Sequence, residues 1–421
     1  MANELQGNIN KKLLRSFTKN FMADVVAAKT VERQLIVNDF DPSTGTQVAM
    51  KRGVQYTPQR SNDGDLTAAT ANPIRVGQVL GEVGQYITVF VENTQVEEAL
   101  ETDQLDQLLM PIAQDMAITL ESELVDRMAK NAALTSGATG TAVNKWSDIA
   151  NAGALMKEIG TPMGEMYALI SNFEEVALAN VQSGLGVQTE VGEAWRTATV
   201  RERFAGFDRV LTSNNLPQYT RGTATAAALS ATPIATYTEY KNTYQMNLAL
   251  SGVTPSTGTF KAGQQIQIAA SKLVNMRNQR LVKKDGNGVP ITLTVLEDAT
   301  AAGGVVTVKV SGAAIIEAGV LSSFNTVNRA LTSGDALVFL GSASADLRPG
   351  LFYHKQFFGL GSVQLPKLHS IDSNVMNFDG FSIRVHRFSD GLGNKNRYRF
   401  DMLPTFACFN PFHGGQLFGT T

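Results

Sequence analysis

The residues best suited to catalysis or metal binding are few, and they lie near the C-terminal end of the chain. The four histidines are His354, His369, His386 and His413, and the single cysteine is Cys408. Protein metal sites use His and Cys at short, regular spacings, and the spacings here match none of them. Cys408 stands in an apolar run, Phe-Ala-Cys-Phe, which favours an inert thiol. We therefore predict packing or surface roles for these side chains, with no metal ion and no catalytic cysteine.

The motifs of common enzymes are also missing from the sequence. There is no Walker loop, no GxGxxG, no GxSxG, no HExxH and no CxxC. Paired carboxylates occur in or beside expected helices, where they are typical of solvated faces or of helix N-termini; the pairs are Glu97 and Glu98, Glu121 and Glu123, and Glu174 and Glu175. We predict that the protein is not an enzyme and takes no cofactor. A hydrolase with an unfamiliar site is the alternative, and it would need a polar cluster in a cleft.

A second group of polar residues lies in the region 41–91. Short strand-like runs (Gln47–Met50, Gln55–Thr57 and Gln85–Val91) flank a polar middle, which predicts a long hairpin or an extended loop. An isolated hairpin is marginally stable in water, so this one should lie against its own domain or against a neighbouring chain. Five charged residues could then form ion pairs between subunits: Lys51, Arg52, Arg60, Asp63 and Asp65. Asp63-Gly-Asp65 lacks the rest of a calcium-binding loop and predicts a polar turn.

The elements that would position these residues begin with helices. Apolar residues at helical spacing predict an amphipathic helix over 9–28, which packs on its own domain or reaches a neighbour. Because proline suits the first turn of a helix, Pro111 divides the next helical region into a short helix over 103–109 and a long one over 111–134.

The region 145–200 alternates helix and strand. Ser147 is a candidate N-cap for a helix that ends near Gly160, and Tyr167–Ile170 has the pattern of a buried strand. Ser171 opens a capping-box pattern with Glu174, which predicts the start of another helix. A further helix is expected over 190–198.

The pattern changes between residues 222 and 345. Alternating strands separated by Gly-containing turns replace the helices; the expected strands are Thr243–Leu250, Gln264–Ala269, Ile291–Leu296, Val305–Val310 and Ala336–Leu340. Such regular spacing is typical of a barrel or sandwich. Mixed texture returns after 345, so we predict a β domain inserted into an α+β domain.

Composition limits the possible partners and location. The 421 residues include 36 Lys and Arg against 38 Asp and Glu, a net charge of −2, and the charged share is 18%. A protein that grips nucleic acid usually has a basic excess, so any DNA contact should be weak and non-specific. No signal peptide or membrane-spanning stretch is evident, and a single cysteine suits a reducing compartment. These features predict a cytoplasmic protein with no membrane contact.

The order of these elements resembles the major capsid fold of tailed bacteriophages, the HK ninety-seven type. Four segments are similar to the coat proteins of short-tailed enterobacterial phages: Lys145–Asp148, Phe204–Pro217, Leu365–Asp372 and Phe409–Pro411. The resemblance covers essentially the whole chain. It implies an α+β capsid fold that carries an inserted all-β barrel domain.

The resemblance also implies a division of the chain. The expected parts are an N-terminal arm (1–40), an extended E-loop region (41–91), a peripheral domain with a spine helix (92–144), the first part of an axial domain (145–221), the inserted β-barrel (222–345), and axial and peripheral return strands (346–421). Some capsid proteins of this type crosslink a Lys to an Asn, and no such trio with a Glu can be assigned here. The N-terminal arm is mostly basic, a departure from the acidic feature implicated in scaffold binding in relatives.

The function implied is that of a major capsid (coat) protein of the virion. Copies would self-assemble as hexamers and pentamers into an icosahedral head, with scaffolding and portal proteins, in the host cytoplasm. The head would enclose double-stranded DNA held non-specifically. A β-rich adhesin is the remaining alternative, and the helical first half and the lack of a signal peptide disfavour it.

Overall fold

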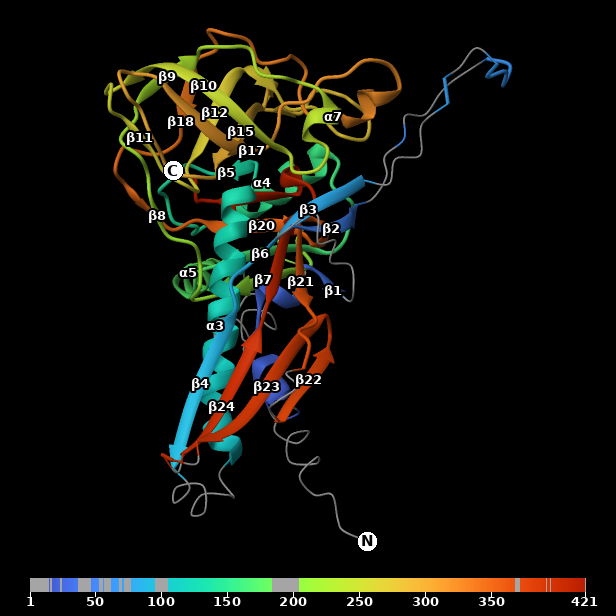
Figure 1. Ribbon diagram of the computed structural model, residues 1–421. Coiled ribbons are helices and arrows are strands. Elements are labelled where there is room, and N and C mark those ends of the chain that lie inside the picture. Colours follow the sequence, from blue (N-terminus) through green and yellow to red (C-terminus); the bar gives the residue numbers. More distant parts are fainter. Residues whose placement is uncertain are drawn as a thin grey trace. The chain divides into compact units, whose positions relative to one another are not determined.

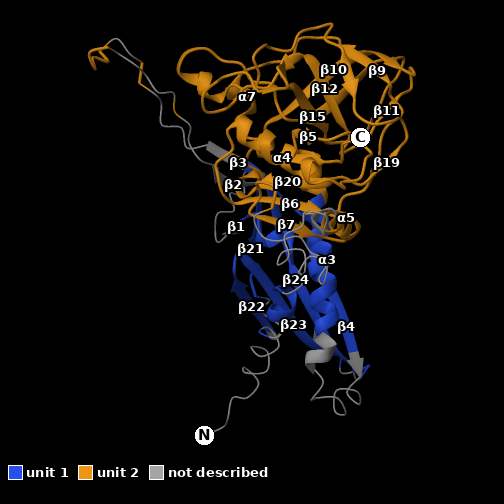
Figure 2. Ribbon diagram, turned by 180° about the vertical axis from the view of Figure 1, so that it is seen from behind, with its two compact units in different colours: residues 1–49, 80–125, 358–407 blue, residues 50–79, 126–357, 408–421 orange. Residues whose placement is uncertain are grey.

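The architecture is described from a computed structural model. It describes residues 15, 17–22, 25–36, 47–52, 56, 62–67, 70–71, 77–94, 105–183, 204–367, 372–390, 392–393 and 395–420. The chain divides into two compact units (Figure 2): residues 1–49, 80–125 and 358–407 form unit 1, and residues 50–79, 126–357 and 408–421 form unit 2. The expected helix over 190–198 lies outside the described residues.

Unit 1 is centred on a four-stranded antiparallel sheet in the order β22-β23-β24-β4 (Figure 1). Its strands are Asp372–Phe378, Phe381–Asp390, Lys395–Met402 and Ile87–Thr94. Phe17 and Phe21, on the helical turn 17–22, are buried against it. Phe17 stacks on Phe400 with ring centroids 4.8 Å apart, and Phe21 meets Phe381 edge-on at 5.6 Å. The described part of the N-terminal amphipathic helix therefore packs on its own chain.

The N-terminal segment continues into a second sheet. The 3₁₀ turn η1 (Ala27–Lys29) leads to strand β1 (Glu32–Ile36), which pairs in parallel with β21 (Phe358–Val363). The sheet order is β1-β21-β25-β3-β2, where β25 is Pro404–Cys408, β3 is Gly77–Val83 and β2 is Gln47–Arg52. β3 and β2 are neighbours in the sheet and lie on either side of residues 53–76 in the chain. The described strands thus include the two that flank the expected long loop.

Helix α3 (Leu105–Asn131) is continuous, so the predicted division at Pro111 was wrong. Pro111 lies early in the helix, where it removes one backbone hydrogen bond at a cost of ~3 kcal/mol. The helix stays continuous despite this cost because it buries a long apolar stripe. The residues of the stripe, all fully buried, are Ala113, Met116, Leu120, Leu124 and Met128. Burial of one such large side chain contributes ~1.5–3 kcal/mol.

Unit 2 contains a five-stranded sheet in the order β5-β26-β20-β6-β7. These strands are Leu134–Ser136, Gly414–Leu417, Gly350–His354, Met166–Ile170 and Arg209–Thr212. Helices α4 (Trp146–Ile159) and α5 (Asn172–Ser183) belong to the same unit. The predicted strand at 167–170 and the capping box are confirmed, since the Ser171 N–H donates to Glu174 Oε2 at 2.8 Å. Helix α4 begins before Ser147, because the Asp148 carboxylate accepts the Lys145 N–H and fixes the first turn there.

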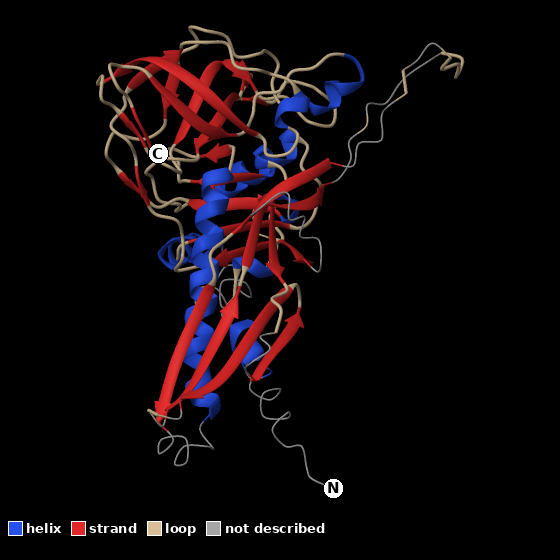
Figure 3. Ribbon diagram, viewed as in Figure 1, coloured by secondary structure: helices blue, strands red, loops and turns tan. Residues whose placement is uncertain are grey.

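The rest of unit 2 is the expected β-rich region, where strands and loops predominate (Figure 3). Its main sheet has the order β18-β12-β15-β17-β10-β9. These strands are Leu337–Phe339, Gln265–Lys272, Pro290–Val295, Val306–Ser311, Gln245–Thr254 and Ala226–Leu229, so all five predicted strands are confirmed. The edge strands β9 and β18 meet at a bridge between Ala228 and Ala336, which makes the sheet barrel-like.

Short elements complete unit 2. They are β8 (Tyr219–Thr220) with β19 (Asp346–Leu347), β11 (Thr259–Phe260) with β16 (Ala299–Thr300), β13 (Lys283–Lys284) with β14 (Asn287–Gly288), helix α7 (Tyr237–Tyr240), and the 3₁₀ turns η3 (Gly319–Phe324), η4 (Lys355–Phe357) and η5 (Pro411–His413). One buried apolar cluster joins α4, the five-stranded sheet and the barrel. The barrel therefore shares its core with residues outside 222–345, and those two boundaries stay predictions.

Candidate functional site

The five charged residues predicted for subunit contacts lie in and after strand β2. Lys51 and Arg52 are its last two residues, and Arg60 lies outside the described residues. Asp63 and Asp65 belong to a described turn over 62–67, and both are exposed. Of the predicted set, the structure thus brings together these two carboxylates.

The turn holds its carboxylates in fixed positions. The Asp65 N–H donates to Asp63 Oδ1 at 3.1 Å, and Asp65 Oδ1 accepts from the Thr67 N–H at 2.9 Å and from the Thr67 hydroxyl at 2.6 Å. The Thr67 hydroxyl, followed by its N–H, holds the pKa of Asp65 below its ordinary value. The turn therefore holds the exposed Asp65 carboxylate in place and favours its ionised form.

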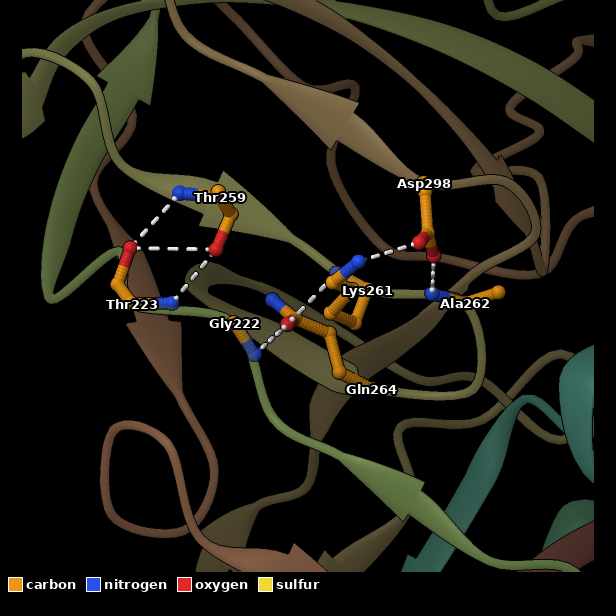
Figure 4. Close-up of polar contacts among 7 residues, drawn as sticks. All are labelled: Gly222, Thr223, Thr259, Lys261, Ala262, Gln264 and Asp298. Atoms are coloured by element: carbon orange, nitrogen blue, oxygen red, sulfur yellow. Dashed lines mark hydrogen bonds and ion pairs between the residues drawn. The ribbon is translucent and has the colours of Figure 1, made fainter.

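The chain enters the inserted region at Gly222 and Thr223, which we call the root of the barrel. Hydrogen bonds join this root to residues 259–264 (Figure 4). Gln264 Oε1 accepts from the Gly222 N–H at 2.9 Å and from the Lys261 N–H at 3.1 Å. Thr223 and Thr259 exchange two backbone-to-hydroxyl bonds of 3.0 Å each. A Cβ on Gly222 would stand 2.0 Å from the Thr259 carbonyl oxygen, so only glycine fits this crossing.

An ion pair supports the same root from outside. Lys261 Nζ lies 2.6 Å from Asp298 Oδ2, and the Ala262 N–H donates to Asp298 Oδ1 at 2.9 Å (Figure 4). The Lys261 ammonium, followed by the Ala262 N–H, holds the pKa of Asp298 below its usual range. Because both side chains are about half exposed, the pair contributes at most ~1 kcal/mol.

The barrel also supplies hydrogen-bond donors to the last turn of α3 and the residues after it. The last carbonyls of a helix have no partner inside it. Here the Ser311 hydroxyl donates to the Asn131 oxygen at 3.0 Å, and Gln265 Nε2 donates to the Leu134 oxygen at 2.8 Å. The Thr294 hydroxyl donates to the Ala132 oxygen. From the five-stranded sheet, Gln416 Nε2 of β26 donates to the Ala129 oxygen at 3.2 Å. Residues far apart in sequence thus stabilise the C-terminal end of the spine helix.

In unit 1, Glu121 of α3 holds the N-terminal segment. Its carboxylate accepts three consecutive backbone N–H groups: Val26 at 2.8 Å and Ala28 at 2.9 Å on Oε1, and Ala27 at 3.0 Å on Oε2. Glu121 is 1% exposed. Burial raises the pKa of Glu121, and the three N–H groups oppose this shift. The expectation that Glu121 lies on a solvated face was wrong.

A second buried carboxylate, Asp401, organises one face of the four-stranded sheet. Arg384 donates to Asp401 Oδ2 at 2.9 Å, Arg399 donates to Oδ1 at 2.7 Å, and the Thr88 hydroxyl donates to Oδ1 at 2.8 Å. Burial acts to raise the pKa of Asp401, but these donors outweigh it and hold the pKa below its ordinary value. His386 Nε2 lies 3.3 Å from Asp401 Oδ2. Burial, and to a smaller extent the positive charge of Arg384, lowers the pKa of His386.

The other candidate chemical side chains that the structure describes lie apart or in structural contacts. Among the described residues, no group of His, Cys, Asp and Glu is arranged to hold a metal ion. His354 and His413 meet edge-on with ring centroids 5.9 Å apart, and burial lowers the pKa of His413 to about 3. His369 lies outside the described residues. Within the described part of the chain, no helix is long and apolar enough to cross a bilayer.

Glu121 and Asp401 are the polar residues that the sequence reasoning missed. Glu121 follows Ala117 by four residues and precedes Leu124 by three, so helical spacing places it beside the buried stripe. This position was a usable signal for burial. Asp401 alternates with apolar residues of a strand, and the two arginines that pair with it come from its own and a neighbouring strand, so spacing alone could not connect all three.

The polar contacts described above join segments of the same chain. The family model described as P22 coat protein, gene protein 5, matches residues 1–419. The chain therefore belongs to the P22 coat protein family. It is 42% identical over 423 residues to the major capsid protein of Acyrthosiphon pisum secondary endosymbiont phage 1, with 100% of each chain covered. The chain is a phage capsid protein with a structural role and is not an enzyme, as predicted.

Solved capsid structures resemble the chain more distantly. The capsid of cyanophage P-SCSP1u is 11% identical with a TM-score of 0.43, covering 93% of this chain and 87% of that one. The capsid of Ralstonia phage GP4 is 9% identical with a TM-score of 0.41, covering 93% and 88%. The family assignment rests on the sequence matches, and with it the expected α+β capsid fold with a barrel-like insertion is confirmed.

Proposed function

We propose that this chain forms the icosahedral head of a phage as hexamers and pentamers, assembled in the host cytoplasm with scaffolding and portal proteins around double-stranded DNA. The observation that carries the proposal is the family match along residues 1–419, which spans every element from the N-terminal helix to the last strand. Self-assembly into a shell and a place in the virion follow from the family. The named partners and the DNA are the proposed part.

The loop between β2 and β3 is the proposed contact between subunits. Lys51 and Arg52 at the end of β2, with Arg60, Asp63 and Asp65 in the loop, give this contact charges of both signs, and exposed ion pairs contribute ~0–1 kcal/mol each. Weak contacts that repeat around a shell add up, and they also allow misplaced subunits to dissociate. A closed shell built from heterologous contacts needs such repeating, non-identical surfaces.

The test compares the full chain with a variant whose loop is shortened around residues 58–68. Both proteins are expressed with a scaffolding protein and separated by sedimentation, and thermal unfolding reports whether the monomer is folded. We expect the variant to fold with an unchanged melting temperature and to yield few shells. Normal shells from the shortened variant would contradict the role proposed for the loop.

A further inference from the structure

The hairpin formed by β13 and β14 carries an unusual concentration of unpaired positive charge. Arg280, Lys283 and Lys284 are all exposed, and Asp285 is the one acidic residue between Arg280 and Gly288. Within the described parts of the chain, none of the three cations forms an ion pair. Several other cations of the barrel have acidic partners, as in Lys261 with Asp298, Lys309 with Glu297 and Arg329 with Asp335. The basic hairpin, defined as residues 280–288, differs from these paired cations.

The basic hairpin is held in one conformation by its turn. Lys284 pairs with Asn287 and Lys283 with Gly288. The two turn residues between them, Asp285 and Gly286, have φ angles of 51° and 80°. Two consecutive residues with positive φ define the tight turn that best fits the twist of a two-stranded hairpin. The lysines therefore occupy defined positions before any partner arrives.

The base of the hairpin is fixed to the barrel. Val282 is buried, its N–H donates to the Leu273 oxygen at 3.0 Å, and its oxygen accepts from the Val289 N–H at 3.0 Å. A preorganised surface loses little conformational freedom when it binds, which favours association. The backbone that carries the three cations is therefore held in place.

The loop that precedes the hairpin is bound to the end of helix α4. Asn275 Nδ2 donates to the Glu158 oxygen at 2.6 Å, and Arg277 Nε donates to the Gly160 oxygen at 2.9 Å. The Met276 N–H donates to the Ile159 oxygen at 2.9 Å. These bonds attach the loop before the hairpin to helix α4 of unit 2.

The chain also contains a fitting surface of opposite charge. The turn over 62–67 exposes Asp63 and Asp65 on either side of Gly64, and the bonds from Thr67 keep the Asp65 carboxylate in place. The hairpin has three cations and one carboxylate, Asp285, so its net charge is +2 (3 − 1), which two carboxylates balance. A nucleic acid would instead require a larger basic excess, and the whole chain has a net charge of −2.

We propose that the acidic turn Asp63–Asp65 of one copy binds the basic hairpin Arg280, Lys283 and Lys284 of a second copy in the shell. The inference rests on the proposed self-assembly and names one contact within it. The two surfaces differ, so the contact is heterologous and can repeat from copy to copy around a ring. Electrostatic complementarity of this kind selects the partner and its orientation.

Charge reversal with mixing tests the contact. One variant carries Asp63→Lys and Asp65→Lys, and the other carries Lys283→Glu and Lys284→Glu. Each alone places like charges in the contact, so we expect the assembly rate with scaffold to fall about tenfold or more at low salt. A one-to-one mixture should recover assembly, because alternating copies then meet with opposite charges. A single chain with all four substitutions should recover as well.

The matched control reverses two exposed lysines outside the proposed contact, Lys157→Glu and Lys367→Glu, and should assemble at the wild-type rate. Wild-type rates for both test variants would overturn the proposal, and so would single variants that fail and are not rescued by mixing. Loss of DNA retention with normal assembly in the Lys283→Glu, Lys284→Glu variant would also overturn it, in favour of a nucleic-acid surface.

A second measurement uses the wild-type chain and does not depend on variant folding. Shells are assembled from equal amounts of ¹⁵N-labelled and unlabelled protein and treated with a carbodiimide, which joins carboxylates to adjacent amines. We expect crosslinked peptides that join Asp63 or Asp65 to Lys283 or Lys284, including mixed-isotope pairs. Intact shells without this crosslink would contradict the contact while leaving self-assembly supported. Failure of the wild type to form shells would instead count against the proposed function.

Discussion

The hydroxyl of Ser311, at the end of the barrel strand β17, donates a hydrogen bond to the carbonyl oxygen of Asn131, the last residue of helix α3, at 3.0 Å. The two residues are 180 positions apart in the sequence. The inserted barrel therefore provides part of the C-terminal cap of the spine helix, and the fold of one depends on the other.

Ser311→Ala should destabilise the protein by ~1–3 kcal/mol, because the partly buried Asn131 carbonyl loses its donor. Urea denaturation followed by circular dichroism measures the change. Thr307→Ala is the matched control, since Thr307 is an exposed hydroxyl residue on the same strand, and it should change stability by less than ~0.5 kcal/mol. Equal effects of the two substitutions would refute the capping role of Ser311.

Glu121→Gln should weaken the attachment of residues 26–28 to the spine helix. The amide oxygen can replace one carboxylate oxygen, but the amide NH₂ would face a backbone N–H, and we expect a loss of ~2–3 kcal/mol. Hydrogen exchange should show faster exchange of the Val26, Ala27 and Ala28 amides. Asp115→Asn serves as the control, since Asp115 is an exposed residue of the same helix. Unchanged amide exchange in Glu121→Gln would show that Glu121 does not hold residues 26–28.

Asp401→Asn should be strongly destabilising, by ~3–5 kcal/mol, because it leaves the buried Arg384 guanidinium without its counter-ion. Asp379→Asn removes the exposed carboxylate that pairs with Arg33 and should cost no more than ~1 kcal/mol. Thermal unfolding of both variants provides the comparison. A similar small shift for both would show that the Asp401 cluster contributes little.

Stability should fall as the pH is lowered below about 6.5, because His413 is buried and neutral. Its pKa is about 3 in the folded chain against an ordinary value of 6.5, so the unfolded state binds more protons in this window. Between pH 6.5 and pH 5 this group alone should remove ~2 kcal/mol. His354 and Arg277, which face His413, oppose its protonation.

His413→Gln should flatten this pH dependence, since glutamine does not titrate. Denaturation at pH 7 and pH 5 measures the difference for each protein. An identical loss of stability on acidification in the variant and the wild type would assign the effect to other groups.

Local patterns predicted much of the fold. The barrel strands alternate apolar and polar residues between glycine turns, and the Asp285-Gly286 turn follows directly from residue type. The continuous α3 was not predictable from Pro111 alone, because the stabilising term is burial against distant segments. Ser311 could not be recognised as a cap of the helix, nor Gln265 as a donor to Leu134 just after it, for the same reason. Asp63 and Asp65 were recognisable as a polar turn, while their partners on another surface depend on the assembled chain.

Electron microscopy of the purified protein, assembled with its scaffolding protein, tests the central claim most directly. We expect closed particles of uniform diameter whose surface divides into hexameric and pentameric clusters. Protein that stays monomeric, or that forms only irregular aggregates under these conditions, would contradict the claim that this chain builds a shell.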